Sequence, residues 1–131
     1  MFVFNAVNNF GMIKVRRIYD PAEPEEGYRV LVDRLWPRGI AKEKAGWDEW
    51  MREVAPGNEL RKWYGHDPSR WEAFKEKYRQ ELSSRNDLLL RLRDLERAHG
   101  TLTLLFSSKE LSLNNAVALR DRKSTRLNSS H

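Results

Sequence analysis

The stretch G-Y-R-V-L-V-D-R-L-W-P-R-G-I, residues 27–40, decides the fold. Its V-L-V centre is an almost continuous apolar run, which is typical of a strand whose two faces are both covered. Pro37 ends this strand, because proline has no N–H to donate to a neighbouring strand. We therefore predict a buried strand over residues 28–35, followed by a turn.

Two further strands are predicted on either side of this stretch. Residues 13–18 alternate apolar with basic side chains, as a half-buried strand does, and residues 101–106 read T-L-T-L-L-F. The segments between the strands have helical patterns, and strands that alternate with helices favour parallel pairing. The sequence thus predicts an α/β fold: a single domain with a small, largely parallel sheet flanked by helices.

Apolar spacing and capping residues predict helical segments over residues 47–54, 58–64, 67–83, 87–99 and 114–120. The first rests on apolar side chains at spacings of three, one and three: Trp47, Trp50, Met51 and Val54. Asp67 is the expected N-cap of the third, because a proline follows it at the first helical position. Asn58 and Asp87 are the expected N-caps of the second and fourth.

The predicted domain spans residues 12–120. Residues 1–11 carry no charge and precede a second methionine, so they are interpreted as an extension or upstream read-through. Residues 121–131, D-R-K-S-T-R-L-N-S-S-H, lack helical or strand periodicity and match one reading frame of a widely used short-read sequencing adapter. We expect this tail to be non-native, with the genomic locus diverging after Arg120; a natural polar tail is the alternative.

The composition excludes several classes of protein. The 131 residues include no cysteine, which rules out a disulfide framework, a thiolate zinc site and a cysteine nucleophile. No apolar run is long enough to span a membrane and no secretory signal is present, so we expect a cytoplasmic protein. The net charge is +5 and falls to +3 without residues 121–131, which weakens the case for a polyanionic partner.

Polar residues follow two of the predicted strands. In open α/β sheets, ligands bind beyond the carboxyl ends of the strands, and parallel neighbours bring such residues together. The candidate ligand-binding residues are Asp33, Arg34, Trp36, Arg38, Trp63, Lys109, Asn114 and Asn115. They favour a small anionic ligand, because guanidinium and ammonium groups bind carboxylate or phosphate and helix N-terminal N–H groups add donors.

Each candidate has an expected role. Arg34, Arg38 and Lys109 bind the anion, Asp33 orients the arginines, the two tryptophans wall the pocket and the two asparagines supply hydrogen bonds. The alternative is structural: Asp33 forms a buried ion pair with one of the arginines that fixes the turn, and Trp36 fills the core. A pocket with solvent-facing guanidinium groups favours the first interpretation, whereas arginines paired with internal carboxylates favour the second.

Acid–base catalysis has two candidates, His66 and Asp33, which would serve an unidentified hydrolase or transferase. His66 precedes Asp67, and a histidine beside a carboxylate can act as a general base. The alternative is that Asp67 caps the following helix and His66 packs on Trp63. The sequence leaves open whether the protein is an enzyme. It predicts no cofactor and no metal site, because the histidines within residues 12–120 lie far apart and cysteine is absent.

A nucleic-acid-binding or regulatory protein is the other function class. Four arginines share one predicted helix, with Asp94 and Glu96 interspersed: Arg85, Arg91, Arg93 and Arg97. Alternating charges of this kind are typical of a solvated face. We recognise no helix-turn-helix spacing and no aromatic RNA-binding strand. Nucleic acid is therefore the less favoured partner.

Three blocks of the sequence resemble the domain of unknown function 488 family, in its short YeaO-like branch: residues 27–40, E-L-R-K-W-Y-G-H-D-P-S-R-W at 59–71, and L-T-L-L-F-S-S-K…N-N-A at 102–116. The likeness covers residues 12–120 in the right order. It implies a small cytosolic α/β domain with no established reaction.

The family's motif positions correspond here to Asp33, Arg34, Trp36, Pro37, Arg38, Gly39, Trp63, His66 and residues 114–116. Longer relatives carry a cysteine-containing segment after the last strand. This chain has no cysteine there, so the resemblance implies that thiol chemistry is absent.

Overall fold

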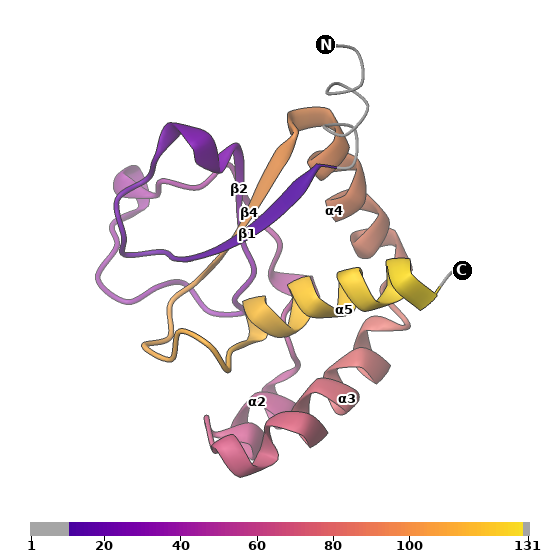
Figure 1. Ribbon diagram of the computed structural model, residues 1–131. Helices are drawn as coiled ribbons and strands as arrows, with labels where there is room; N and C mark the ends of the chain where they lie inside the picture. Colours follow the sequence, from indigo (N-terminus) through magenta and orange to yellow (C-terminus); the bar gives the residue numbers. More distant parts are fainter. Residues whose placement is uncertain (1–10, 130–131) are drawn as a thin grey trace.

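The computed structural model describes the backbone of residues 11–129 and the side chains of residues 11–122. Its centre is a four-stranded sheet in the order β1-β4-β2-β3 (Figure 1), formed by β1 (Met12–Arg17), β2 (Tyr28–Leu31), β3 (Glu49–Trp50) and β4 (Thr101–Phe106). All neighbouring strands are parallel. The predicted α/β fold with a small parallel sheet is therefore confirmed.

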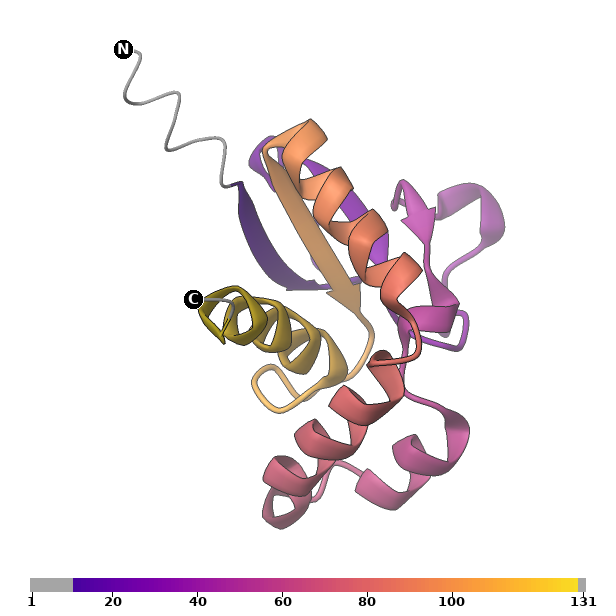
Figure 2. The ribbon, with the colours of Figure 1, turned by 90° about the vertical axis from the view of Figure 1, so that its right-hand side faces the viewer.

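The helices lie on one face of this sheet. They are α2 (Asn58–Tyr64), α3 (Trp71–Leu82), α4 (Asn86–His99) and α5 (Asn115–Ser129), with short 3-10 turns at Pro24–Glu26, Lys42–Lys44, Arg52–Val54 and Pro68–Arg70. Figure 2 shows α4 and α5 in front of the sheet, where α4 contacts β4 and β2 and α5 contacts β1 and β4. Among the described residues, no helix is long and apolar enough to cross a membrane.

Alternation along β4 separates two apolar cores. Leu104 and Phe106 belong to the larger core, which contains buried side chains from every helix of the helical layer. Leu105 points to the opposite face, as period-two alternation requires. The smaller cluster on that face comprises Ile18, Leu31 and Leu105, with Ile40, Trp47 and Trp50 packed against it. Loops that follow β1 and β2 thus cover the face that the helices leave open.

A buried ion cluster lies on the loop-covered face. The Glu26 side chain is almost fully buried, and its carboxylate accepts a 2.8 Å hydrogen bond from Nε of Arg29, which is itself only 7% exposed. Nη1 of Arg16 lies 3.2 Å from the other Glu26 oxygen. The Thr103 hydroxyl donates to the Glu26 backbone oxygen at 2.6 Å. These contacts join the loop after β1 to β2 and β4.

Gly27 lies where this loop enters β2. Its φ is 65°, and a Cβ there would lie 2.2 Å from the Thr101 carbonyl oxygen. Only glycine combines that dihedral with so close an approach of two backbones.

The predicted helix over residues 47–54 is wrong. This segment forms β3, a bend and a 3-10 turn, because its backbone bonds to the sheet: Asp48 N donates to Arg29 O at 2.8 Å and Met51 N to Leu31 O at 2.9 Å. Its four apolar side chains divide between the two cores rather than sharing one helix face. Sheet pairing thus overrides a spacing that is compatible with a helix.

Several element boundaries also differ from the predictions. β2 ends at Leu31 rather than residue 35, α2 has Gly57 as its N-cap in place of Asn58, and α4 begins at Asn86. The last helix continues past residue 120 to Ser129, because its sequence contains no glycine or proline to end it and an established helix propagates at low cost. The predicted extension lies outside the described residues, apart from Gly11.

A surface ion pair joins β3 to α4. The Arg91 guanidinium donates two hydrogen bonds to the Glu49 carboxylate, at 2.6 and 2.9 Å, and the Tyr28 hydroxyl donates a third at 3.1 Å. The hydrogen bond from Arg91 holds the pKa of Glu49 below its ordinary value, against the opposing effect of burial. Ionised Glu49 therefore stabilises the folded state, and this contribution disappears as the pH falls through the folded pKa.

We expect Arg91→Ala to lower the melting temperature at neutral pH. The difference from the wild type should shrink below about pH 4, where unfolded glutamate is protonated. Thermal unfolding followed by circular dichroism across this range measures it. Arg97→Ala, on the same helix and exposed, is the control and should show no such pH dependence. An equal loss at all pH values would contradict the assignment.

Candidate functional site

The carboxyl ends of β2 and β4 meet at Asp33. One carboxylate oxygen of Asp33 accepts hydrogen bonds from Ser107 N at 2.9 Å and Ser107 Oγ at 2.6 Å. The other accepts one from Asn115 Nδ2 at 3.1 Å, and Asn115 also donates to Val32 O at 3.0 Å. Asp33 therefore joins the ends of two neighbouring parallel strands to the first turn of α5.

The Asn114 side chain caps the start of the same helix. Its side chain is fully buried, its Nδ2 donates to Glu110 O at 2.8 Å and its Oδ1 accepts from Val117 N at 2.9 Å. This is the bonding of an N-cap residue, which satisfies one of the free N–H groups of the first turn. The structure thus uses both asparagine side chains to position α5.

The Arg34 side chain bonds to residues other than its neighbour Asp33. Its Nε donates to Pro56 O at 3.2 Å and its Nη2 to Ala55 O at 3.1 Å, and its Nη1 lies 3.6 Å from the exposed carboxylate of Glu53. Its side chain is only 15% exposed. Asp33 forms no ion pair with Arg34 or Arg38 within the described residues, so the prediction of a buried ion pair at Asp33 is wrong. Arg34 instead anchors the segment before α2.

Arg38 and Lys109 are the predicted cations that remain exposed. They lie on the loops that follow β2 and β4, and neither side chain forms an ion pair or hydrogen bond with another residue in the described part of the chain. The backbone oxygen of Arg38 accepts a 2.7 Å hydrogen bond from the Tyr19 hydroxyl. That contact fixes the Arg38 loop against the loop after β1.

The two tryptophans expected to wall a single pocket belong to separate clusters. Trp36 is 38% exposed and stacks edge-on against Trp47 and Trp50, at centroid distances of 5.0 and 5.5 Å. Trp63 packs against the larger core, and Arg70 lies 5.1 Å from its ring centroid. The structure places these rings on opposite faces of the sheet. Trp36 also does not fill the core, contrary to the structural alternative.

His66 lies close to the loop that carries Lys109. Its φ is 56°, its ring lies 5.6 Å from that of Tyr64, and the Tyr64 hydroxyl donates to Leu113 O at 2.7 Å. The backbone N–H groups of Ser112 and Leu113 lower the pKa of Glu110, and the nearby His66 lowers it further.

The Asp67 carboxylate bonds to Ser69 and not to the His66 ring. Its carboxylate accepts hydrogen bonds from Ser69 N at 3.0 Å and Ser69 Oγ at 2.8 Å. The first of these bonds, from the backbone N–H, lies at the start of the 3-10 turn Pro68–Arg70 that precedes α3. The capping alternative is therefore confirmed for Asp67, whereas His66 contacts Tyr64 rather than Trp63.

Sequence comparison identifies the relatives of this chain. The profile of the inactive DUF488-N3 subclade, a branch of the domain of unknown function 488 family, matches residues 12–131. The chain belongs to this family. It is 44% identical to the uncharacterized protein YeaO of Escherichia coli over 109 residues, which cover 83% of this chain and 94% of YeaO.

An uncharacterized protein of Mycobacterium tuberculosis is 46% identical over 70 residues, or 53% of this chain and 59% of that protein. An uncharacterized protein of Mycobacterium bovis matches equally well. No solved structure matches the chain at a significant level.

The W-P-R-G motif of this DUF488-N3 chain forms a closed turn. Trp36 Nε1 donates to Ile40 O at 2.6 Å, and Gly39 adopts a φ of 82° that favours glycine. Pro37 is buried while Arg38 points outward. The motif therefore presents one free guanidinium at the carboxyl edge of the sheet.

Ser107 belongs to this site, although it is not among the candidate ligand-binding residues named from the sequence. It follows β4 directly, as Asp33 follows β2 closely, and parallel pairing sets these polar positions side by side. Arg17, at the end of β1, adds a 2.9 Å hydrogen bond from Nε to Ser108 O. In the part of the chain that the structure describes, no group of three or more acidic, histidine or cysteine residues could hold a metal ion.

Proposed function

We propose that this protein is a non-catalytic binding protein that holds a small anion at the carboxyl edge of its sheet. The observation that carries the proposal is that two cations, Arg38 and Lys109, share the same features. Both are exposed and unpaired within the described residues, and their loops follow two neighbouring parallel strands. Cations left without partners at this edge favour a carboxylate or phosphate ligand.

The start of α5 supports the same ligand. Val117 N is bonded to the N-cap residue Asn114, whereas the N–H group of the partly exposed Asn115 makes no hydrogen bond with the described residues. Free N–H groups at a helix N-terminus, together with the helix dipole, attract anions. In this proposal Arg34 and Asp33 are positioning residues, because their hydrogen bonds hold the loops rather than face a ligand.

The proposed absence of catalysis rests on the state of the two acid–base candidates. The Asp33 carboxylate accepts three hydrogen bonds from Ser107 and Asn115, which use most of its acceptor sites and favour a positioning role. His66 forms no hydrogen bond with a carboxylate among the described residues. Membership of the inactive DUF488-N3 subclade agrees with this proposal.

Nucleic-acid binding is the less favoured candidate. Of the four arginines considered for nucleic-acid binding, Arg91 is paired with Glu49, and Arg85 lies 3.9 Å from Glu53. Their charges are therefore partly neutralised, whereas binding to a polyanion needs a continuous basic surface.

A thermal-shift titration with inorganic phosphate and sulfate tests the proposal. At ten times the dissociation constant, binding to the folded state should raise the melting temperature by about 4 °C. Lys109→Ala and Arg38→Ala should each reduce this shift by at least half, whereas Lys62→Ala, an exposed lysine of α2, should leave it unchanged.

No shift with either anion would contradict the proposal. Tight binding of a single-stranded oligonucleotide, with affinity that falls steeply with salt, would favour the nucleic-acid alternative instead. Turnover of any phosphate ester by the purified protein that is lost in Asp33→Asn would contradict the non-catalytic assignment.

A further inference from the structure

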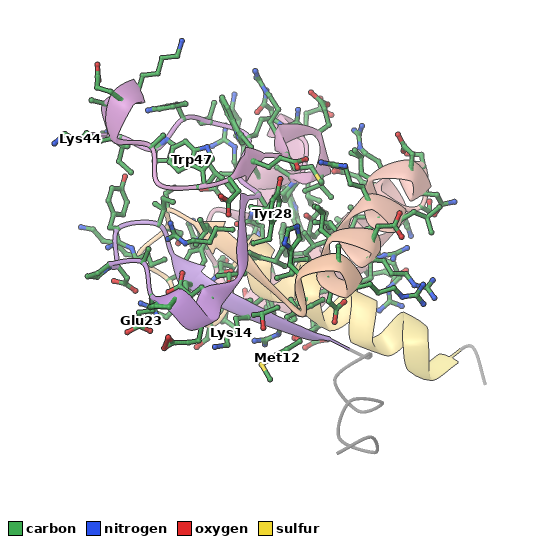
Figure 3. The ribbon with its side chains drawn as sticks, turned by 90° about the horizontal axis from the view of Figure 1, so that it is seen from above. Met12, Lys14, Glu23, Tyr28, Lys44 and Trp47 are labelled. Atoms are coloured by element: carbon green, nitrogen blue, oxygen red, sulfur yellow. The ribbon has the colours of Figure 1, made fainter. Side chains whose placement is uncertain are left out.

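A pocket of about 400 Å³ lies on the loop-covered face of the sheet. The loop after β1 forms one side of it, through Tyr19 and Asp20, and the connection between β2 and β3 forms the other, through residues 39–47. Figure 3 shows Lys44 and Trp47 on this connection, and Glu23 on the other loop. The volume falls within the range of small-molecule sites.

A buried cation forms part of the lining of this pocket. Arg29 is only 7% exposed, yet it lines the cavity. Its Nε donates to Glu26 and its Nη1 to the Gly46 backbone oxygen, while its Nη2 makes no hydrogen bond with the described residues. A guanidinium nitrogen of a lining residue that has no acceptor within the described part of the protein is available to a ligand oxygen.

A second cation stands at the rim. Lys44 ends the 3-10 turn Lys42–Lys44, it is exposed, and its ammonium has no partner among the described residues. Asp20 is the acidic residue of the lining, and it lies 4.0 Å from Arg16, whose closer partners are Glu23 and Glu26. Lys44 is therefore the lining cation that has no carboxylate partner among the described residues.

The remaining lining is aromatic and apolar. Tyr19 and Trp47 present rings and Ile40 an aliphatic side chain, and the Tyr19 ring is held in place by its hydroxyl bond to Arg38 O. Arg17 stacks on the Tyr19 ring at 4.7 Å from its centroid. Aromatic side chains pack well on flat ligands, so a planar apolar body suits these walls.

We propose that this pocket binds a small organic anion with a planar apolar body, such as an aromatic carboxylate or aryl phosphate. The anionic group meets Arg29 and Lys44, and the planar body lies against Trp47, Ile40 and Tyr19. This site does not depend on the proposed function, because neither Arg38 nor Lys109 contributes to its lining.

Benzoate and phenyl phosphate are the probes, and amide and indole chemical shifts of the ¹⁵N-labelled full chain are the readout. We expect saturable shifts at Ala41, Gly46 and the Trp47 indole, with a dissociation constant of about 1 mM for so small a ligand. The tighter of the two probes identifies the preferred anionic group. Benzamide and acetate, which lack the charge and the ring respectively, should bind at least about tenfold more weakly.

Lys44→Met should weaken benzoate binding about tenfold, through loss of one charge-assisted contact. Lys42→Met is the matched control on the same exposed turn, does not line the pocket and should bind as the wild type does. Ala41→Phe, at an exposed lining position, should abolish binding by filling the cavity.

The proposal is overturned if no probe perturbs these resonances, or if acetate binds as well as benzoate. It is also overturned if the two lysine variants weaken binding equally. Because phosphate binding at Arg38 and Lys109 is measured with other probes and other variants, the two sites can fail independently.

Discussion

Replacing Glu26 with glutamine is expected to lower the free energy of unfolding by about 3–5 kcal/mol, the largest effect that we predict for a charged residue. Glu26 is almost fully buried between Arg29 and Arg16. The neutral amide leaves the buried Arg29 guanidinium without its countercharge, and an unpaired buried charge costs more than the pair contributes.

Urea unfolding followed by fluorescence measures this loss. Glu25→Gln, one position earlier and exposed, is the matched control and should change stability by less than about 0.5 kcal/mol. If Glu26→Gln unfolds as the wild type does, the ion cluster contributes nothing to stability, and its description as the link between β1, β2 and β4 is wrong.

Asp33→Asn is expected to cost about 3 kcal/mol and to lower the melting temperature by about 10 °C. The Asp33 carboxylate accepts three hydrogen bonds, from Ser107 N, Ser107 Oγ and Asn115 Nδ2. An asparagine side chain places an N–H₂ group against some of these donors, so at least one of them loses its acceptor.

Asp94→Asn is the control, because Asp94 is exposed on α4 and has no hydrogen bond or ion pair among the described residues. It should leave the melting temperature within about 2 °C of the wild type. A small effect at Asp33 combined with loss of a chemical activity would show that the carboxylate is catalytic and not structural.

The sequence predicts the elements whose local signals agree with their packing. β4 is predicted to the residue, because T-L-T-L-L-F is both apolar and bounded by Gly100 and a polar loop. α3 lies within the helix predicted over residues 67–83, and its Phe74 and Tyr78 side chains are buried in the larger core. In these segments the local pattern and the tertiary contacts favour the same structure.

The β3 segment shows where such reasoning fails. Trp47, Trp50, Met51 and Val54 have helical spacing, yet backbone hydrogen bonds from this segment to β2 decide its conformation. Nothing local encodes that pairing, because it depends on a strand about twenty residues earlier. The sheet therefore has one strand more than the sequence predicted.

The strand ends converge as the sequence predicts, but the contacts made there were not predicted. Parallel β2 and β4 bring Asp33 together with Ser107 and Asn115, which are two candidates and one residue outside the candidate list. The partners of Arg34 are backbone carbonyls of residues 55 and 56, and no side-chain pattern reveals such acceptors. The pocket on the loop-covered face was not predicted, because its lining comes from two loops without a motif.

Mapping phosphate onto the protein by NMR tests the central claim most directly. When inorganic phosphate is titrated into the ¹⁵N-labelled chain, we predict saturable shifts at Arg38, Lys109 and Asn115, together with the Arg38 side-chain N–H. Shifts absent from these residues, or spread evenly over exposed lysines and arginines elsewhere, would contradict an anion site at the carboxyl edge of the sheet.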